Sequence, residues 1–197
     1  MCIAISRGSK SASESRSVPR TNQLWRDLLR AYAEARKTWE VVPAYQFAKW
    51  LNGRNPCVVA DLGCGEMLIA DRVTNGHTIL PFDHVAVDDR VTACDISAIP
   101  LDDASVDIAI LSLALMGKNH ADYIHEARRI LRVDGHLWLC EPTSSIGSDE
   151  IRLRSVLTEF GFDLYRMDLV GQFTFVRAVR ADSATMSGSV SIKLHST

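Results

Sequence analysis

The stretch that most constrains the fold is residues 58–66, an apolar run that ends in two glycines one residue apart. The run predicts a short buried strand. Gly63 and Gly65 allow a tight turn and a close approach to a ligand that a Cβ would prevent. The dinucleotide fingerprint would place a third glycine where Leu68 stands, and here Asp61 precedes the turn instead. For Gly-x-Gly alone, a strand that merely turns into a helix is an equally good interpretation.

Asp61 changes that balance, because a carboxylate at the strand end can accept a hydrogen bond from a cationic amino group. With this acid in front, the stretch resembles motif I of the S-adenosylmethionine-dependent methyltransferases. Their cofactor carries an ammonium and a sulfonium but no phosphate. The resemblance implies S-adenosylmethionine as the cofactor, held by Asp61, Gly63 and Gly65.

Periodicity along the rest of the chain predicts one α/β domain over residues 21–180. Residues 1–20 are rich in Ser and Arg and are expected to form a flexible tail, and residues 181–197 to be loosely held. Two helices are expected within residues 21–54, the second from Pro43 to Asn52. The core is expected at residues 55–180, with strands at 58–62, 78–82, 91–95, 106–112, 136–140, 162–165 and 173–176, and helices at 67–75, 120–131 and 149–160.

This order predicts a doubly wound, mostly parallel sheet with helices on both faces and a C-terminal antiparallel strand. Asp83 ends the second strand, eighteen residues past Gly65, where an acid accepts hydrogen bonds from ribose hydroxyls. Asp88 and Asp89 are its rivals. After the third strand, Asp95 and Ile96 are expected to contact the adenine of the cofactor, with a helix cap as the competing role for Asp95.

The loop of residues 113–119, Leu-Ala-Leu-Met-Gly-Lys-Asn, follows the strand that Ser112 ends. It leaves the sheet beside the strand that carries Asp61, at the carboxyl edge where open α/β sheets bind ligands. We therefore expect the methyl donor and the methyl acceptor to meet at this loop.

Several runs together resemble the nucleomethylin-type ribosomal RNA-processing methyltransferases, over roughly residues 32–175. These runs are 59–66, 82–83, 90–95, 99–101 and 113–119, of which the Leu-Met-Gly-x-Asn loop is the most specific. The resemblance implies a Rossmann-like class I methyltransferase with an N-terminal helical extension, which methylates N1 of an adenine in large-subunit rRNA. It also implies that the cofactor contacts are Gly63, Asp83, Asp95, Ile96 and Ser112.

Three positions depart from that family. Leu29 stands where the family has a histidine that helps to close the cofactor pocket, Glu40 replaces a proline, and Lys118 replaces a threonine. These changes bear more on the choice of substrate than on cofactor binding.

Methyl transfer to adenine N1 needs no general base, because N1 already presents an in-plane lone pair. Catalysis then rests on positioning the reacting atoms, about 3 to 3.5 Å apart. We expect Met116 to pack on the base, Asn119 to orient its edge and Lys118 to hold a phosphate. Arg30 and Lys37 of the first helix are further candidates for RNA contacts, although a solvated helix face is the favoured interpretation of these cations.

Composition limits the partners. The formal net charge of −2 gives no overall attraction to nucleic acid, so RNA would have to bind a local patch. Five cysteines without a Cys-x-x-Cys pair predict a reduced intracellular compartment and no metal site. No apolar run approaches the roughly 20 residues that span a membrane, so a soluble protein is expected. The expected location is the nucleolus or nucleus in a eukaryote, and otherwise the cytoplasm.

Two other function classes stay open. A small-molecule methyltransferase would fit the near-neutral charge and predicts an apolar acceptor pocket without a basic rim. A catalytically silent module that binds RNA or chromatin would fit the loss of a pocket residue at Leu29. The sequence also leaves open whether a partner or a fused domain delivers the RNA.

Overall fold

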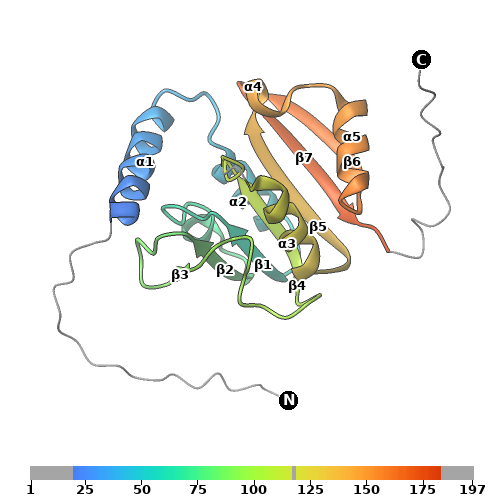
Figure 1. Cartoon of the computed structure of the whole chain (residues 1–197), viewed down its shortest axis with the longest axis horizontal. Helices are drawn as coiled ribbons and strands as arrows, with labels where there is room; N and C mark the ends of the chain where they lie inside the picture. Colours follow the sequence, from blue (N-terminus) through green and yellow to red (C-terminus); the bar gives the residue numbers. More distant parts are fainter. Residues whose placement is uncertain (1–19, 117–118, 183–197) are drawn as a thin grey trace.

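A computed structural model describes residues 20–116 and 119–182, which form a seven-stranded sheet in the order β3-β2-β1-β4-β5-β7-β6 (Figure 1). β1 to β5 run parallel, and β7 lies antiparallel between β5 and β6. The doubly wound, mostly parallel sheet with C-terminal antiparallel strands is therefore confirmed. The strands are β1 Val58–Leu62, β2 Thr78–Asp83, β3 Thr92–Ala93, β4 Val106–Ser112, β5 Leu131–Pro142, β6 Phe162–Val170 and β7 Phe173–Arg180.

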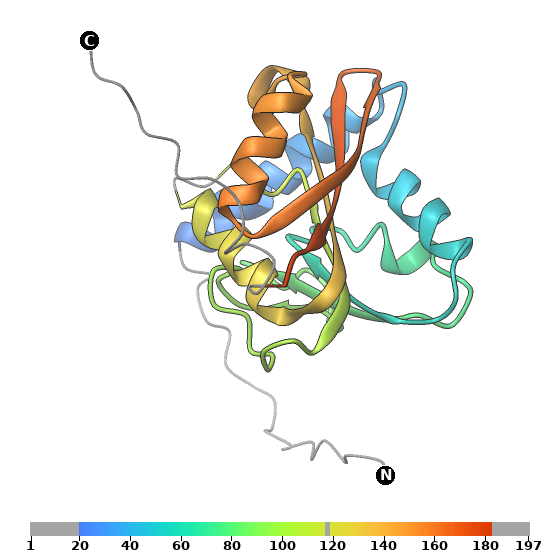
Figure 2. The ribbon, with the colours of Figure 1, turned by 90° about the vertical axis from the view of Figure 1, so that its right-hand side faces the viewer.

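Helices cover both faces of this sheet (Figure 2). The helices are α1 Arg20–Arg36, α2 Pro43–Asn52, α3 His120–Ile130, α4 Thr143–Ile146 and α5 Glu150–Glu159. On one face, Tyr123 of α3 and Leu157 of α5 join a core with Leu111 of β4. On the other face, Phe47 of α2 packs with Ile110 and Trp138. Strands buried on both sides explain the nearly continuous apolar runs of β1 and β4.

The helix expected over residues 67–75 is wrong. Turns follow the glycines, and only the short 3₁₀ helix η1, Ala70–Arg72, forms there. Met67 has a φ of 59°, and a left-handed residue cannot continue an α-helix. The side chain of Asn52 then accepts from the backbone N–H of Thr74, 2.8 Å away, which holds the exit from η1 against α2.

Several of the expected strands differ in length from those observed. No helix separates β2 from β3 or β3 from β4 in the described chain, and β3 has two residues instead of the expected five. β5, β6 and β7 are longer than expected, because the β6–β7 hairpin pairs along nearly its whole length. The short helix α4 lies where no element was expected.

Three segments lie outside the described residues: 1–19, 117–118 and 183–197. The expected flexible tail, the phosphate role of Lys118 and the loosely held C-terminal segment fall there, apart from Arg20, which begins α1, and residues 181–182. None of the helices in the described ranges is long and apolar enough to cross a membrane.

Candidate functional site

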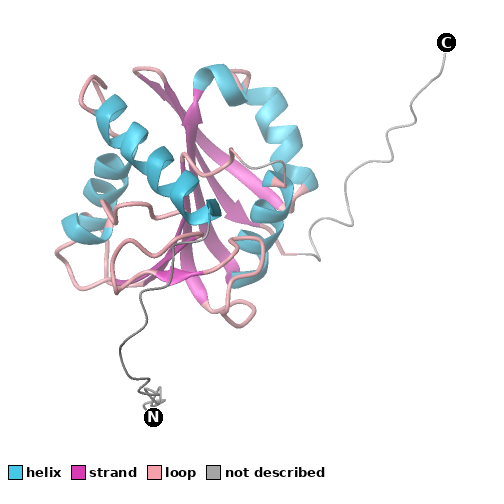
Figure 3. Cartoon of the chain, turned by 60° about the vertical axis from the view of Figure 1, so that its left-hand side comes forward, coloured by secondary structure: helices cyan, strands magenta, loops and turns pink. Residues whose placement is uncertain are grey.

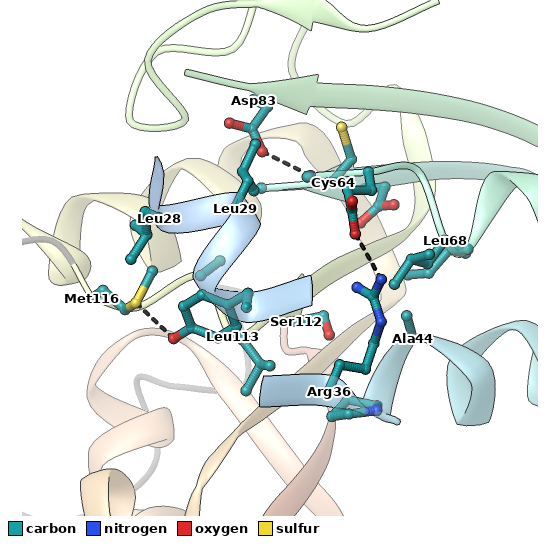
Figure 4. A pocket seen from close by; sticks show the side chains of 18 of the residues that line it. Leu28, Leu29, Arg36, Ala44, Cys64, Leu68, Asp83, Ser112, Leu113 and Met116 are labelled. Carbon is teal, nitrogen blue, oxygen red and sulfur yellow. Dashed lines mark hydrogen bonds and ion pairs between the residues drawn. The ribbon is translucent and has the colours of Figure 1, made fainter. Parts of the chain in front are cut away.

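A pocket lies at the carboxyl ends of β1, β2 and β4, where the strand order reverses (Figure 4). The helix α1 crosses in front of the sheet (Figure 3), and its side chains line the pocket. Ligands of open α/β sheets bind at this switch point. The pocket brings together seven of the residues selected from the sequence, namely Asp61, Gly63, Gly65, Asp83, Ile96, Ser112 and Met116.

The two glycines adopt backbone conformations that other residues rarely take. Gly63 has a φ of 80°, and a Cβ on it would lie 2.9 Å from the Cβ of Ala114. Gly65 has a φ of 53°, and its N–H donates to Oδ2 of Asp83 over 2.8 Å. Asp83 thus fixes the glycine turn from the neighbouring strand, and the turn keeps this wall of the pocket free of side chains.

Asp61 is the electrostatic centre of the pocket. It is 1% exposed, and its Oδ2 has no hydrogen-bond partner in the described part of the chain. Burial, and secondarily the neighbouring Asp83, raise the pKa of Asp61 to about 7. A buried carboxylate without a partner calls for a cation. The ammonium of S-adenosylmethionine, the cofactor that the resemblance implies, fits this requirement.

The loop after β4 is held from the next strand. Leu113 has a φ of 57°, and its N–H donates to the carbonyl of Cys140. Glu141, 4% exposed at the end of β5, accepts from the N–H of Leu115 over 2.9 Å, and burial raises its pKa to about 7. The loop that carries Met116 is therefore anchored to β5. The sequence reasoning missed Glu141, whose only signal is an acid at the carboxyl end of a parallel strand.

Side chains of α1 complete the pocket, and of these only Leu29 was placed there from the sequence. Trp25, Leu28, Leu29, Tyr32 and Arg36 line it. The hydroxyl of Tyr32 donates to the sulfur of Met116, 2.8 Å away, and Arg36 forms a 2.7 Å ion pair with Glu66 after the glycine turn. The sequence signal for this pocket-lining role is the set of apolar residues that recur along α1 at helical spacing. The first of them, Leu24, is nevertheless 71% exposed.

Other predicted residues lie away from the pocket. The carboxylate of Asp95 accepts from the N–H and hydroxyl of Ser97 within a turn, so it caps no helix there, and the side chain is exposed. Asn119 occupies the position before α3 and does not line the pocket. The rival Asp88 pairs with Arg90 instead.

The two cations selected on α1 are tied to neighbouring acids. Arg30 lies 3.5 Å from Asp27, and Lys37 lies 2.7 Å from Glu34, with all four side chains more than half exposed. This arrangement matches the solvated-face interpretation, and their RNA contacts stay a prediction. Within residues 20–116 and 119–182, no group of three His, Cys, Asp or Glu side chains could hold a metal ion.

The two carboxyls with raised pKa values predict an unusual pH dependence of stability. Their ordinary values are 3.8 for Asp61 and 4.5 for Glu141, so between about pH 4 and pH 7 the folded state binds more protons than the unfolded state. The free energy of unfolding of the ligand-free protein should therefore fall as pH rises from 5 to 8. Urea denaturation at both pH values measures this, and the double variant Asp61→Asn, Glu141→Gln should flatten the difference. An unchanged slope in that variant would contradict the assignment.

Comparison with known proteins agrees with the geometry. A family model described as "Hypothetical methyltransferase" matches residues 7–196. "Ribosomal RNA-processing protein 8" of Caenorhabditis elegans is 36% identical over 167 residues, covering 84% of this chain and 48% of that protein. The "25S rRNA (adenine(645)-N(1))-methyltransferase" of Schizosaccharomyces pombe is 41% identical over 120 residues, covering 59% of this chain and 37% of that protein. This chain thus spans about half the length, or less, of these curated relatives.

A solved structure shows the same fold. The 1,6-didemethyltoxoflavin-N1-methyltransferase of Burkholderia thailandensis, crystallised with 1,6-didemethyltoxoflavin and S-adenosylhomocysteine, superposes with a TM-score of 0.63. The superposition covers 87% of this chain and 94% of that chain, at 19% sequence identity. At this identity the likeness establishes the fold and leaves the ligands to be argued from the pocket.

Proposed function

Since the chain belongs to the family described as hypothetical methyltransferase, we propose that it binds S-adenosylmethionine in this pocket and methylates N1 of an adenine in ribosomal RNA. The observation that carries the cofactor is Asp61, a buried carboxylate without a hydrogen-bond partner for its Oδ2, beside a glycine turn that admits a ligand. The acceptor is supported by the relative named as an rRNA adenine-N1-methyltransferase. A nucleolar, nuclear or cytoplasmic location, and delivery of the RNA by a partner or fused domain, belong to the same proposal.

Each wall of the pocket has a role in this proposal. When bound, the cofactor supplies an electrophilic methyl group on a sulfonium. Asp61 pairs with its ammonium, Asp83 accepts from its ribose hydroxyls, and Ile96 lies against its adenine ring. α1 covers the mouth and keeps water from the donor.

The acceptor side needs positioning and no proton abstraction. The bond from adenine N1 to the methyl carbon forms as the bond from sulfur to that carbon breaks, and the positive charge passes from sulfur to the base. Met116 lies on the mouth of the pocket, where it can pack on the base, and Glu141 fixes the loop that carries it. Asn119 is assigned to the base edge on the family resemblance alone.

A small-molecule acceptor is the second candidate. The observation that favours it is that Arg30 and Lys37, the two cations selected on α1, pair with neighbouring acids and leave less free positive charge for an RNA backbone. The two candidates differ in salt dependence. RNA binding should weaken steeply between 50 and 200 mM salt, whereas binding of a neutral small molecule should not.

Methyl transfer tests the proposal directly. The purified protein is incubated with deuteromethyl-labelled S-adenosylmethionine and deproteinised rRNA, and digested nucleosides are analysed by mass spectrometry. We expect labelled N1-methyladenosine, with Met116→Ala about tenfold slower. Val133→Ala, a change at another exposed apolar residue outside the pocket, is the matched control and should keep the wild-type rate. Label in another nucleoside, or none from protein that binds the cofactor, would contradict the acceptor.

A further inference from the structure

A second hollow, the aromatic groove, adjoins the cofactor pocket. It lies between α1 and the turn that joins β6 to β7, and its volume is about 290 Å³. That volume is near the lower bound of about 300 Å³ for small-ligand pockets. Four residues line both hollows, namely Leu28, Tyr32, Trp39 and Leu113, so the groove is continuous with the site proposed for the methyl donor. Ala35, Pro142, Gln172 and Phe173 line the groove and not the pocket.

Aromatic rings give the groove its character. Tyr32 and Trp39 meet edge to face with ring centroids 6.1 Å apart, and Trp39 and Phe173 do so at 5.1 Å. No lysine or arginine is among the described residues that line it. Aromatic surfaces without cations favour a flat, neutral ring over a phosphate.

Gln172 is the one lining residue with a side-chain amide. The turn that carries Gln172 is fixed, because the backbone carbonyl of Gln172 accepts from the N–H of Thr143 over 2.9 Å. Its carboxamide is exposed and makes no hydrogen bond to any residue of the described ranges. A free carboxamide can pair with N6 and N7 of adenine. That pairing uses the Hoogsteen edge and leaves N1 free.

We propose that the aromatic groove binds the unpaired adenine that is to be methylated, with Gln172 reading its N6 and N7 atoms. This inference rests on the proposed function and deepens it. A paired adenine would have N1 engaged in its base pair, so the groove takes a base that is single-stranded or flipped out. The ring surfaces hold the base, and the carboxamide turns its N1 edge toward the pocket that Tyr32 and Leu113 also line.

A binding cycle tests the role of Gln172 without any methyl transfer. The probes are two labelled oligouridylates, one with a single central adenine and one with 7-deazaadenine, which lacks the N7 acceptor. Fluorescence anisotropy measures their affinities for wild-type protein and for Gln172→Ala. We expect the wild type to bind the 7-deazaadenine probe about fivefold more weakly than the adenine probe. Gln172→Ala should bind the adenine probe about fivefold more weakly than the wild type does, and should bind both probes equally. Equal binding of both probes by the wild type, or discrimination that survives in Gln172→Ala, would overturn the proposal.

A blocked groove gives the second test. Ala35→Leu places a larger side chain in the groove without touching the cofactor pocket, and Ala33→Leu is the control, because Ala33 of α1 lines neither hollow. We expect Ala35→Leu to weaken binding of the adenine probe about tenfold and to keep S-adenosylmethionine affinity within twofold. Unchanged RNA binding by a folded Ala35→Leu would refute the groove. If the probes bind as expected but the protein transfers no methyl group to RNA, the result counts against the proposed methyltransferase function and not against the groove.

Discussion

Asp61→Asn should weaken S-adenosylmethionine binding about a hundredfold and at the same time stabilise the ligand-free protein at pH 8. The first effect follows because a hydrogen bond between charged groups in a buried site contributes roughly 3 kcal/mol. The second follows because burial raises the pKa of Asp61 from 3.8 to about 7, so ionisation at pH 8 costs the folded state about 4 kcal/mol. The amide needs partners of its own, which leaves a net gain of about 1 kcal/mol.

Calorimetric titration and urea denaturation measure the two effects on the same samples. The gain in stability should vanish at pH 5, where Asp61 is already protonated in the folded protein. Asp163→Asn, at an exposed acid on β6, makes the same charge change away from the pocket and should alter neither quantity. If Asp61→Asn lost stability at pH 8 and kept its cofactor affinity, Asp61 would be a structural residue and not the ammonium ligand.

Gly63→Ala should be the most damaging single-methyl change in the glycine turn. The substitution forces an alanine into a φ of 80° and sets its Cβ 2.9 Å from the Cβ of Ala114, on the loop that follows β4. We expect a loss of about 3 kcal/mol in unfolding free energy, from left-handed strain of about 1 kcal/mol and a clash of about 2 kcal/mol. The displaced turn should also lower cofactor affinity at least tenfold.

Gly76→Ala provides a control for that prediction. Gly76 has a φ of 81°, and the nearest atom to the position of its Cβ would be Cγ of Pro56, 3.8 Å away, which is an ordinary contact. The control variant should therefore lose about 1 kcal/mol in free energy of unfolding and keep its cofactor affinity. Thermal and urea denaturation of both variants separate the backbone term from the clash. Equal losses in the two variants would show that the turn relaxes around the new methyl group.

The sheet and the cofactor cradle could be predicted because their signals are local. β1 and β4 are apolar runs with few alternatives, and a glycine turn preceded by an acid carries its chemistry in consecutive residues. The predicted bounds of β4 agree with the observed strand, Val106–Ser112, because its apolar run lies between polar turns. The parallel order then placed Asp61 and Asp83 at one edge.

The missed features depend on contacts between distant segments. The pattern of Met67, Leu68, Ala70 and Val73 is helical, but Met67 and Ile69 are buried in a turn whose left-handed residue breaks the helix. The helical spacing of apolar residues predicts α1, but periodicity shows only that one face is covered and does not show that this face lines a pocket. Glu141 and Gln172 became visible only when β5 and the β6–β7 turn were placed beside the loop after β4 and α1.

The central claim is that this chain has a working S-adenosylmethionine site, and one measurement tests it most directly. Calorimetric titration of the wild-type protein at pH 8 should give one site per chain with micromolar affinity. At pH 6.5, binding should release more protons per site than at pH 8, because Asp61 is then largely protonated and the ammonium of the cofactor displaces its proton. A folded protein that produces no binding heat at either pH would contradict the claim and favour a module that keeps the fold without the cofactor.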